Sequence, residues 1–482
     1  MLLRSTLIYA PAVLLTRISA LLLLAIATRL IDQTEYGLLT LVVTIGEMTD
    51  VAVTNWLRIS LLRLGGKGEI SRGSVMLAAR VLLATTALAL CISVVASAVI
   101  VPERWIAFAT AVSVYLIAGS IGRFGLTVLQ MQQRHSTYSM LEFLRAGLQL
   151  ALPIIAISFF EKSFLIVSLG TSLGTMIAGA FSVLIATRRL VAGPPRFTHR
   201  DLFALGLPLV IMALVGFGLS NAERIVLKVF HDAGAVAVFA AAYALARQPI
   251  DMLANAVNMG AFPEVVSRFD SDGPRAAALF LRQLMALMIR LCLPVAALLV
   301  ALAGDITALV LPADYLGANI VQLFPVIALS VLAANISNFV YGSVVHAHKR
   351  PWLLIIADGL GSIATISLSL LLIPSMAGIG AALSLLGGSL TGLAGCIVIS
   401  HRLTPVPIPM RDIGISLVIA IGCGLAAHLA AGAFAAFPVI VRLAAGGAAG
   451  GLVFLGLNAL FHRQATLDMT GKLRGKLSRS GA

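Results

Sequence analysis

Residues 74–101 read SVMLAARVLLATTALALCISVVASAVIV. Only one of these 28 residues, Arg80, carries a charge. A helix needs about 20 apolar residues to cross the hydrocarbon core of a bilayer, and this segment exceeds that length. Glycine, proline and charged residues bound it on both sides, as breaks between spans would. We therefore predict a transmembrane helix over residues 74–101.

The same composition extends over the whole chain of 482 residues, of which 60 % are hydrophobic and only 11 % are charged. A typical soluble domain has about 25 % charged residues, and a soluble chain of this size would need far more polar surface to cover its core. We predict an all-α polytopic membrane protein. About fourteen segments are long and apolar enough to cross a bilayer: 7–29, 37–62, 74–101, 105–130, 137–160, 163–187, 203–227, 234–260, 278–303, 320–345, 352–373, 377–400, 413–434 and 438–461.

The cations are distributed unequally between the two sides that these spans define. About 20 lie on the side of the N-terminus, and four lie on the other side: Arg29, Arg104, Lys162 and Lys228. The positive-inside rule places both termini in the cytoplasm. The formal net charge of +14 follows from this pattern, in which cations separate apolar runs instead of clustering on a polar face. Nucleic-acid binding is therefore not expected.

The loops and a weak internal similarity suggest two halves. Asp32 and Asn55 match Asp232 and Asn255 at an offset of 200 residues, and two six-helix lobes are a recurring transporter plan, with substrate between the lobes. We predict a six-helix lobe over 1–187, a cytoplasmic linker over 188–202 and a second six-helix lobe over 203–400. Two additional helices over 401–461 and a basic cytoplasmic tail over 462–482 would follow.

Several arginines lie inside the expected spans. A charge at the middle of a bilayer costs about 2.5–3.5 kcal/mol on insertion scales, so such a residue faces a cavity or a partner. The candidates for substrate binding are Arg17, Arg123, Arg247 and Arg290. Guanidinium groups bind phosphate bidentately, which favours a large anionic ligand. The amides of Asn55 and Asn255 suit sugar hydroxyls, although amides within spans also hold helices together.

Three intramembrane acids are candidates for ion coupling or for pairing with an arginine. Glu47 and Asp50 lie three residues apart and carry the same sign, so they require a cation, a proton or an arginine from another helix. Arg17 is the partner that we expect, because the first two spans should be neighbours. Asp251 lies four residues after Arg247, so the two can also neutralise each other on one helix face.

No sequence motif indicates catalysis, a metal site or a cofactor. The four cysteines lie far apart in apolar stretches, and no spacing of cysteine and histidine resembles a zinc or iron–sulfur site. Gly65–Gly68 lacks the spacing of an ATP-binding loop. The expected loops are too short for an extramembrane catalytic domain. We therefore expect no enzymatic activity, and transport driven by an ion gradient, the membrane potential or the gradient of the substrate.

Four short motifs resemble one family of transporters. Residues 29–37, RLIDQTEYG, resemble a signature in which an Arg-Leu pair is followed by Glu-Tyr-Gly. Residues 204–209 (ALGLPL), 312–315 (PADY) and 378–382 (GIGAA) are similar to a G-L-P-L entry, a G-x-x-Y turn without its glycine and a G-x-x-G-A-A entry. The family is that of the Wzx-type polysaccharide or oligosaccharide flippases, within the multidrug/oligosaccharidyl-lipid/polysaccharide exporter superfamily. Residues 235–237 depart from the usual Val-Gly turn of the second lobe.

This resemblance implies a two-lobed transporter of the bacterial inner membrane. Its substrate would be an oligosaccharide linked to a polyprenyl pyrophosphate, moved from the cytoplasmic to the periplasmic leaflet by alternating access through a cationic cavity. Arg17 and Arg247 fit the positions at which family members carry arginines, and Arg123 and Arg290 follow. Membrane lipids would surround the protein, and a polysaccharide polymerase and chain-length machinery would be its candidate protein partners.

Three alternatives stay open at this point. A cation-coupled multidrug exporter of the same superfamily should have twelve spans and unpaired acids in its cavity. A membrane polysaccharide polymerase or ligase would need a long external loop with catalytic groups. A structural or recruiting membrane protein would have no use for so many costly intramembrane charges.

Overall fold

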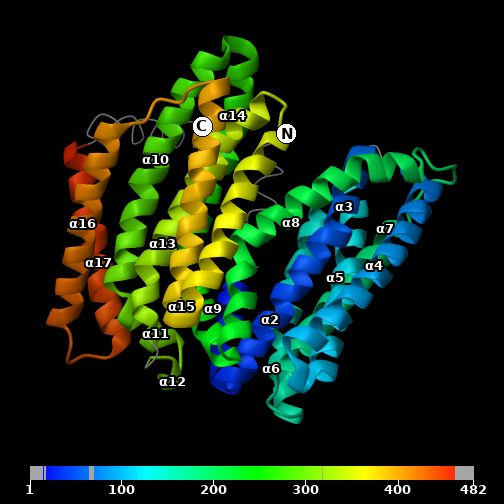
Figure 1. Ribbon diagram of the computed structural model, residues 1–482, viewed down its shortest axis with the longest axis horizontal. Coiled ribbons are helices and arrows are strands. Elements are labelled where there is room, and N and C mark those ends of the chain that lie inside the picture. The colour runs from blue at the N-terminus through cyan, green and yellow to red at the C-terminus, as the bar shows by residue number, and fades with distance from the viewer. Residues whose placement is uncertain (1–14, 16–17, 65–69, 317–318, 462–482) are drawn as a thin grey trace, which may run out of the picture. The chain divides into compact units, whose positions relative to one another are not determined.

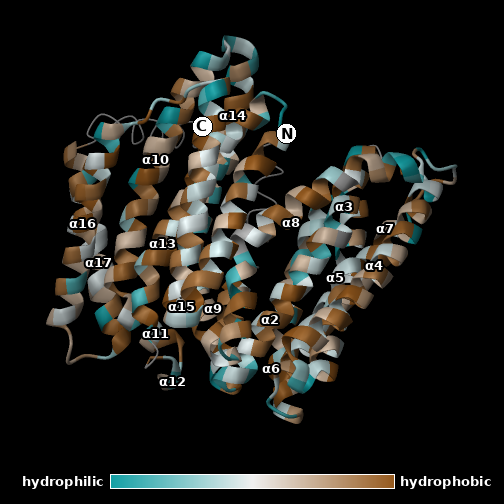
Figure 2. Cartoon of the chain, viewed as in Figure 1, coloured by the Kyte–Doolittle hydropathy of each residue, from teal (hydrophilic) through white to brown (hydrophobic). Residues whose placement is uncertain are grey.

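The computed structural model describes residues 15, 18–64, 70–316 and 319–461. Their regular structure is helical, apart from a single bridge between Ser71 and Val191 (Figure 1). Figure 2 shows apolar residues along the helices and polar residues mainly near their ends. Within these described ranges, eleven helices are long and apolar enough to cross a membrane. The predicted all-α polytopic membrane fold is confirmed.

The chain divides into two compact units. Unit 1 comprises Met1–Ala241 and Asp358–Gly388, and unit 2 comprises Ala242–Ala357 and Ser389–Ala482. Two helices contribute residues to both units, α9 (Ala233–Asp272) and α15 (Trp352–Leu403).

The helices of unit 1 account for the first half of the chain. In order they are Ile18–Leu30, α2 (Gln33–Asp50), the π-helix η1 (Val51–Asn55), α3 (Trp56–Leu64), α4 (Arg72–Ile100), the 3-10 helix η2 (Pro102–Arg104), α5 (Trp105–Met131), α6 (His135–Phe159), α7 (Phe164–Thr187) and α8 (His199–Phe230).

The remaining helices belong to unit 2. They are α10 (Pro274–Ala301), α11 (Ala303–Val310), α12 (Ala313–Leu316), α13 (Ile320–Ile336), the π-helix η3 (Ser337–Tyr341), α14 (Gly342–Ala347), α16 (Met410–Ala433) and α17 (Val439–Phe461).

The expected spans differ from the eleven apolar helices in three places. The expected first span, 7–29, begins outside the described residues, and the helix Ile18–Leu30 is short. The expected second span covers most of α2, η1 and α3, which carry more charge than an apolar span. The expected spans 352–373 and 377–400 form one element, α15, interrupted at Ala377, where φ is 46°. The number fourteen therefore stays a prediction.

Helix α5 lies at the centre of unit 1 and packs against α4, α7 and α2. Small residues allow the close approach to α7. A Cβ on Gly179 of α7 would lie 2.8 Å from the Cα of Gly122 in α5, so the two backbones touch there. Helices in membranes associate through such small residues, because lipid provides no hydrophobic drive to bring larger ones together.

The predicted linker 188–202 is fixed to the start of α4. The backbone N–H of Arg72 donates to the carbonyl of Val191 at 2.8 Å, and the N–H of Arg196 donates to Ser74 Oγ at 2.9 Å. These bonds satisfy backbone N–H groups at and near the start of α4 that would otherwise lack a hydrogen-bond acceptor. The segment therefore belongs to unit 1 as an ordered connection into α8.

In unit 2, α10 packs between α13 and α16, and α16 packs against α17. Two glycines of α17 bring it close to its neighbours. A Cβ on Gly446 would lie 2.9 Å from the carbonyl oxygen of Ala427, and one on Gly450 would lie 3.1 Å from that of Cys423. The two additional helices are thus held together by a glycine pair spaced four residues apart.

The similarity at an offset of 200 residues has a structural counterpart. Asp32 Oδ1 accepts a hydrogen bond from the backbone N–H of Glu35 at 2.8 Å, and Asp232 Oδ1 accepts one from the N–H of Ala235 at 2.7 Å. Each aspartate therefore caps the start of a helix, α2 and α9 respectively. The same cap at equivalent positions supports the proposed duplication.

Candidate functional site

An ion pair crosses the interior of unit 1 between α2 and α5. Arg123 Nη2 lies 2.8 Å from Asp50 Oδ1, and the Asp50 side chain is only 5 % exposed. Thr54, one turn further along, also donates to Asp50 Oδ1. Gly119 provides the space for the arginine, because a Cβ there would lie 2.2 Å from Arg123 Nη2. The buried carboxylate is therefore matched by a cation from another helix.

A second polar chain connects α6 to α7. Arg145 binds both carboxylate oxygens of Glu142, at 3.3 and 2.6 Å, and donates to Gln149 Oε1 at 3.0 Å. Gln149 Nε2 in turn donates to Thr175 Oγ1 at 2.8 Å. Each member of this chain satisfies the next, as buried polar groups in a low dielectric require.

A cavity of about 240 Å³ lies beside these two groups. Its charged lining consists of Arg58, Arg123, Arg145 and the single acid Glu142. Gln130, Tyr138 and Thr175 add hydrogen-bonding groups, and the rest of the lining is Gly119, Gly122, Leu126 and Thr127. Three guanidinium groups against one carboxylate make the cavity cationic, as anion binding requires.

A matching cluster lies on α9 in unit 2. Arg247 Nε donates to Asp251 Oδ2 at 2.7 Å, and Asn335 of α13 donates to Asp251 Oδ1 at 2.9 Å. Tyr243, one turn before Arg247, accepts a hydrogen bond from Arg247 Nη1 and lies under its guanidinium. The side chain of Arg247 is 39 % exposed. Asp251 thus pairs with Arg247 on one helix face, the simpler of the two interpretations of this spacing.

The other predicted residues have different positions. Asn55 ends η1 and is half-buried, Asn255 is exposed and donates to the backbone carbonyl of Asp251, and Glu47 is exposed. Arg290 lies in a separate cleft beside α16. Arg17 lies outside the described residues.

Each cluster adjoins a π-helix. Asp50 directly precedes η1, and Asn335 lies two residues before η3. Short π-helical segments within longer helices occur frequently at functional sites, because they re-aim side chains at a backbone irregularity. The two clusters are therefore the candidate sites of their units.

A comparison with protein families shows the family of this chain. A family model described as "Polysaccharide biosynthesis protein" matches residues 26–320, more than half of the chain. The chain belongs to this family. No curated protein sequence matches it.

Solved structures show the fold that the family adopts in this chain. The lipid II flippase MurJ, in an inward closed conformation, superposes with a TM-score of 0.69 at 13 % sequence identity, over 95 % of this chain and 100 % of the other. An inward-facing multidrug resistance MATE family transporter of the MOP superfamily gives a TM-score of 0.53 at 14 % identity, over 85 % and 95 % of the two chains. An outward-facing MATE structure gives 0.50 at 14 % identity, over 86 % and 95 %. The chain therefore has the fold of these three structures. The family model confirms the predicted resemblance to polysaccharide biosynthesis proteins.

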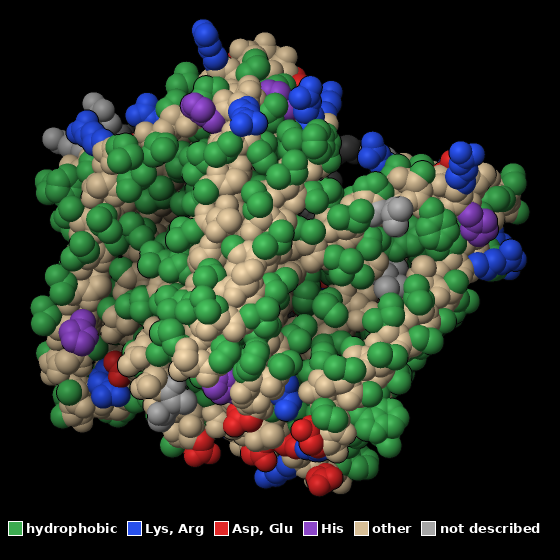
Figure 3. Space-filling model, viewed as in Figure 1, with side chains coloured by type: hydrophobic (Ala, Val, Ile, Leu, Met, Phe, Trp, Pro, Cys, Tyr) green, Lys and Arg blue, Asp and Glu red, His purple; other side chains and the backbone are tan. Residues whose placement is uncertain are grey.

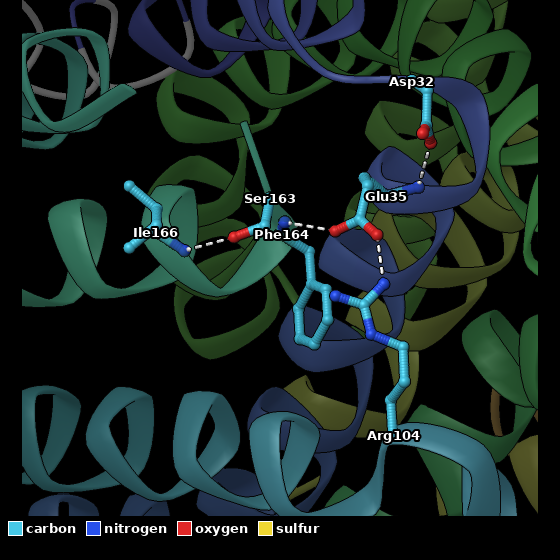
Figure 4. Close-up of polar contacts among 6 residues, drawn as sticks. All are labelled: Asp32, Glu35, Arg104, Ser163, Phe164 and Ile166. Atoms are coloured by element: carbon cyan, nitrogen blue, oxygen red, sulfur yellow. Dashed lines mark hydrogen bonds and ion pairs between the residues drawn. The ribbon is translucent and has the colours of Figure 1, made fainter. Parts of the chain in front are cut away.

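The signature over 29–37 has a structural role. Glu35 accepts hydrogen bonds from Arg104 and from the backbone N–H of Phe164, the latter at 2.7 Å, and the guanidinium of Arg104 lies 4.9 Å from the centre of the Phe164 ring (Figure 4). Asp32 caps the same turn at the Glu35 N–H. We name Glu35, Arg104 and Phe164 the clamp. It ties the start of α2 to the turn before α5 and to the start of α7.

Sequence reasoning missed several of these residues. The clamp and the pairing of Gln149 with Thr175 depend on contacts between residues far apart in the sequence, which no spacing reveals. Glu223 and its neighbour Arg224 could have been found, because both charges lie inside the expected span 203–227. Glu223 is completely buried, and Arg224 Nη1 donates to Thr44 at 3.4 Å.

Proposed function

We propose that this protein transports polyprenyl-pyrophosphate-linked oligosaccharide from the cytoplasmic to the periplasmic leaflet by alternating access. The cavity lined by Arg58, Arg123 and Arg145 carries this proposal. A guanidinium presents two parallel N–H donors that match the oxygens of a phosphate, and a site of low dielectric strengthens that attraction. A pyrophosphate offers enough oxygens to engage more than one of them.

The oligosaccharide requires hydrogen-bonding groups beside the cations. Gln130, Tyr138 and Thr175 line the same cavity and can bind sugar hydroxyls. Asn55 lies on η1, and Asn255 is exposed on α9, so both amides also remain candidates. The cavity is too small for a whole oligosaccharide, and we assign it the pyrophosphate and the first sugar.

The two acid–arginine pairs are the proposed coupling groups. In each pair, Asp50 with Arg123 and Asp251 with Arg247, the carboxylate neutralises the arginine when substrate is absent. A bound phosphate competes for the same guanidinium, which then releases the carboxylate to take up a proton or a cation. Such an exchange links substrate binding to an ion gradient. Glu47 is a further candidate for coupling, and Arg17 and Arg290 stay predictions of substrate binding from the sequence.

The family and the fold support this assignment. The family is described by polysaccharide biosynthesis, and one protein of the same fold is a lipid II flippase. Taken together with the cationic cavity, these favour a lipid-linked sugar over a free one. We further propose that the protein is a transporter rather than an enzyme, that it lies in the bacterial inner membrane with both termini in the cytoplasm, and that a polymerase and chain-length machinery act after it.

A cation-coupled multidrug exporter is the second candidate, and the MATE structures of the same fold favour it. A binding site for cationic drugs needs acids that are not neutralised by arginine. Asp50 and Asp251 both pair with arginines, and the cavity of unit 1 has a cationic excess. The electrostatics of these sites therefore favour an anionic substrate.

The test measures polyprenyl-linked glycans by mass spectrometry in cells that contain or lack this protein. We expect a complete lipid-linked oligosaccharide to accumulate when the protein is absent, together with loss of surface polymer. Complementation with Arg123→Gln should fail, and complementation with Arg189→Gln, an exposed arginine outside the cavity, should succeed. Unchanged glycans with altered sensitivity to cationic drugs would instead establish the exporter.

A further inference from the structure

A second cavity, of about 430 Å³, lies between α10 and α16 in unit 2. Its polar lining is Arg282, Gln283, Arg290 and Asp412, and its apolar lining is Leu279, Ala286 and Leu287. We name it the α10–α16 cleft. Leu279 at its edge is 55 % exposed, on a helix whose composition is that of a membrane span. The cleft therefore opens on a surface that faces lipid.

The two arginines of the cleft differ from the other intramembrane arginines of unit 2. Arg247 pairs with Asp251, and Arg442 pairs with Asp305. No ion pair or hydrogen bond joins Arg282 or Arg290 to any carboxylate in the described ranges, although Asp412 lines the same cleft. A guanidinium in contact with hydrocarbon is costly without a counter-charge. Within the described part of the chain these two guanidiniums thus lack a paired carboxylate, and an anionic ligand could supply the counter-charge.

Arg282 and Arg290 line one cleft at two levels of α10. They lie eight residues apart, about 12 Å along the helix axis. Side chains on a helix lean toward its N-terminus, so Arg290 extends in the direction of Arg282. A phosphate between these two levels lies within reach of the Arg290 side chain and below the start of Arg282.

The same direction leads to the cytoplasmic surface. Helix α10 starts after Arg268 and carries Arg275 in its first turn, on the side that the positive-inside rule assigns to the cytoplasm. On the face drawn in Figure 3, Lys and Arg side chains also gather over the ends of the unit 2 helices at the top of the view, where α10 begins. Arg282 therefore lies nearer the headgroups of the cytoplasmic leaflet, and Arg290 leans toward them from deeper in the span.

Helix α16 contributes to the same end of the cleft. Its N-cap residue is Pro409, which provides no side-chain acceptor for the first backbone N–H groups. The first turn includes Asp412, which lines the cleft. Open N–H groups at a helix start attract anions. Asp412 reduces the net positive charge of the cleft to about one, two guanidiniums against one carboxylate.

We propose that the α10–α16 cleft binds the phosphate of an anionic phospholipid of the cytoplasmic leaflet, held by Arg282 and Arg290. The headgroup supplies the missing counter-charge, and its acyl chains lie along the exposed apolar surface beside Leu279. The bound lipid joins α10 to the two additional helices, so it stabilises the packing of α16 and α17 on unit 2. This site is separate from the cavity to which we assign the substrate.

The test compares lipid binding to the purified full-length protein by native mass spectrometry. Phosphatidylglycerol is the anionic probe, and phosphatidylcholine is the neutral one. We expect phosphatidylglycerol to bind more tightly and to raise the melting temperature more. Arg282→Gln and Arg290→Gln should each weaken phosphatidylglycerol binding about tenfold, as expected for the loss of charge-assisted hydrogen bonds. Binding of phosphatidylcholine should not change, which shows that the variants are folded.

Arg268→Gln is the matched control. It removes one arginine from the same side of unit 2, but Arg268 pairs with Glu264 and lies outside the cleft. The proposal is wrong if phosphatidylglycerol binds no better than phosphatidylcholine, or if both cleft variants behave like Arg268→Gln. Farnesyl pyrophosphate distinguishes the source of the phosphate. Tighter binding of this probe than of phosphatidylglycerol, lost in the cleft variants, would assign the cleft to the transported lipid and refute the phospholipid.

Discussion

Arg123 reaches from α5 to α2, where its Nη2 lies 2.8 Å from Oδ1 of Asp50. The carboxylate is buried, whereas the arginine is 35 % exposed and lines the cavity of unit 1. One group therefore serves two partners, the acid on one side and any ligand of the cavity on the other. Stability and transport should depend on this pair in different ways.

The first prediction separates these two effects. Arg123→Gln leaves the buried Asp50 without its cation. Losing one partner of a fully buried ion pair costs about 3–5 kcal/mol of folding free energy, and we expect less here because Arg123 is 35 % exposed. Adding Asp50→Asn removes the isolated charge and should restore most of the melting temperature in detergent. Export should stay lost in the double variant, because the cavity still lacks a guanidinium. A double variant that is stable and exports normally would remove Arg123 from the substrate site.

The second prediction concerns Arg247, whose Nε binds Asp251 while its Nη1 binds Tyr243. Lysine keeps the charge but cannot make both bonds, since its ammonium is a single point. Arg247→Lys should therefore be inserted normally and lose export by tenfold or more, about 1.4 kcal/mol or more. Surface polymer and protein abundance in cells measure the two effects.

Asn255→Ala provides the control for this experiment. Asn255 lies two turns beyond Arg247 on α9, is exposed, and donates only to the carbonyl of Asp251 in its own helix. Its replacement should change export less than Arg247→Lys does. Equal export by Arg247→Lys and the unaltered protein would show that a point charge suffices and that bidentate binding is not required.

Composition and periodicity predict most of the fold but only part of the sites. Apolar runs such as 74–101 predict helices, because a bilayer imposes length and hydrophobicity on each span. Contacts within one helix can also be predicted, since Arg247 and Asp251 lie four residues apart. The pairing of Asp50 with Arg123 could not be predicted, because Arg123 belongs to a distant helix and the sequence favours Arg17 of the adjacent first span.

The clamp illustrates the same limit. Glu35 belongs to the family signature, but its partners are Arg104, before α5, and Phe164, at the start of α7. These segments meet only when α2, α5 and α7 pack together. The spacing of residues does not determine such packing. Small residues decide it instead, and glycine patterns in apolar sequence are too common to identify the contacts in advance.

The third prediction tests the clamp. Glu35→Ala removes the acceptor of both Arg104 and the Phe164 N–H and should lower the free energy of unfolding by about 2–3 kcal/mol. Arg104→Ala should cost less, about 1 kcal/mol, because the arginine is 43 % exposed and its pairing is weakened by solvent. Melting temperatures of the purified variants measure both changes.

The neighbouring Glu103 is the control for the clamp. It is exposed in η2, next to Arg104, and no clamp contact involves it. Glu103→Ala should shift stability by less than about 0.5 kcal/mol. If Glu35→Ala were no more destabilising than Glu103→Ala, the clamp would not contribute to the stability of unit 1.

The last prediction concerns Gly37, the glycine of the signature. It packs against the start of α9, where a Cβ would lie 1.7 Å from the carbonyl oxygen of Ala233 and 2.5 Å from its carbonyl carbon. These are backbone atoms, so no side chain can move aside. Gly37→Ala must separate α2 from α9, and overpacking of this kind costs about 1–3 kcal/mol or more. We expect little folded protein, measured as the fraction extracted from membranes that stays monodisperse in detergent.

Gly147 in α6 is the matched control, because it is exposed and a Cβ there meets nothing within 4 Å. Gly147→Ala should be neutral or stabilise by up to about 1 kcal/mol, since alanine favours the helix more than glycine. Opposite signs for these two identical substitutions would place the cause in the contact with α9, whereas equal behaviour would show that Gly37 is there for reasons other than close packing.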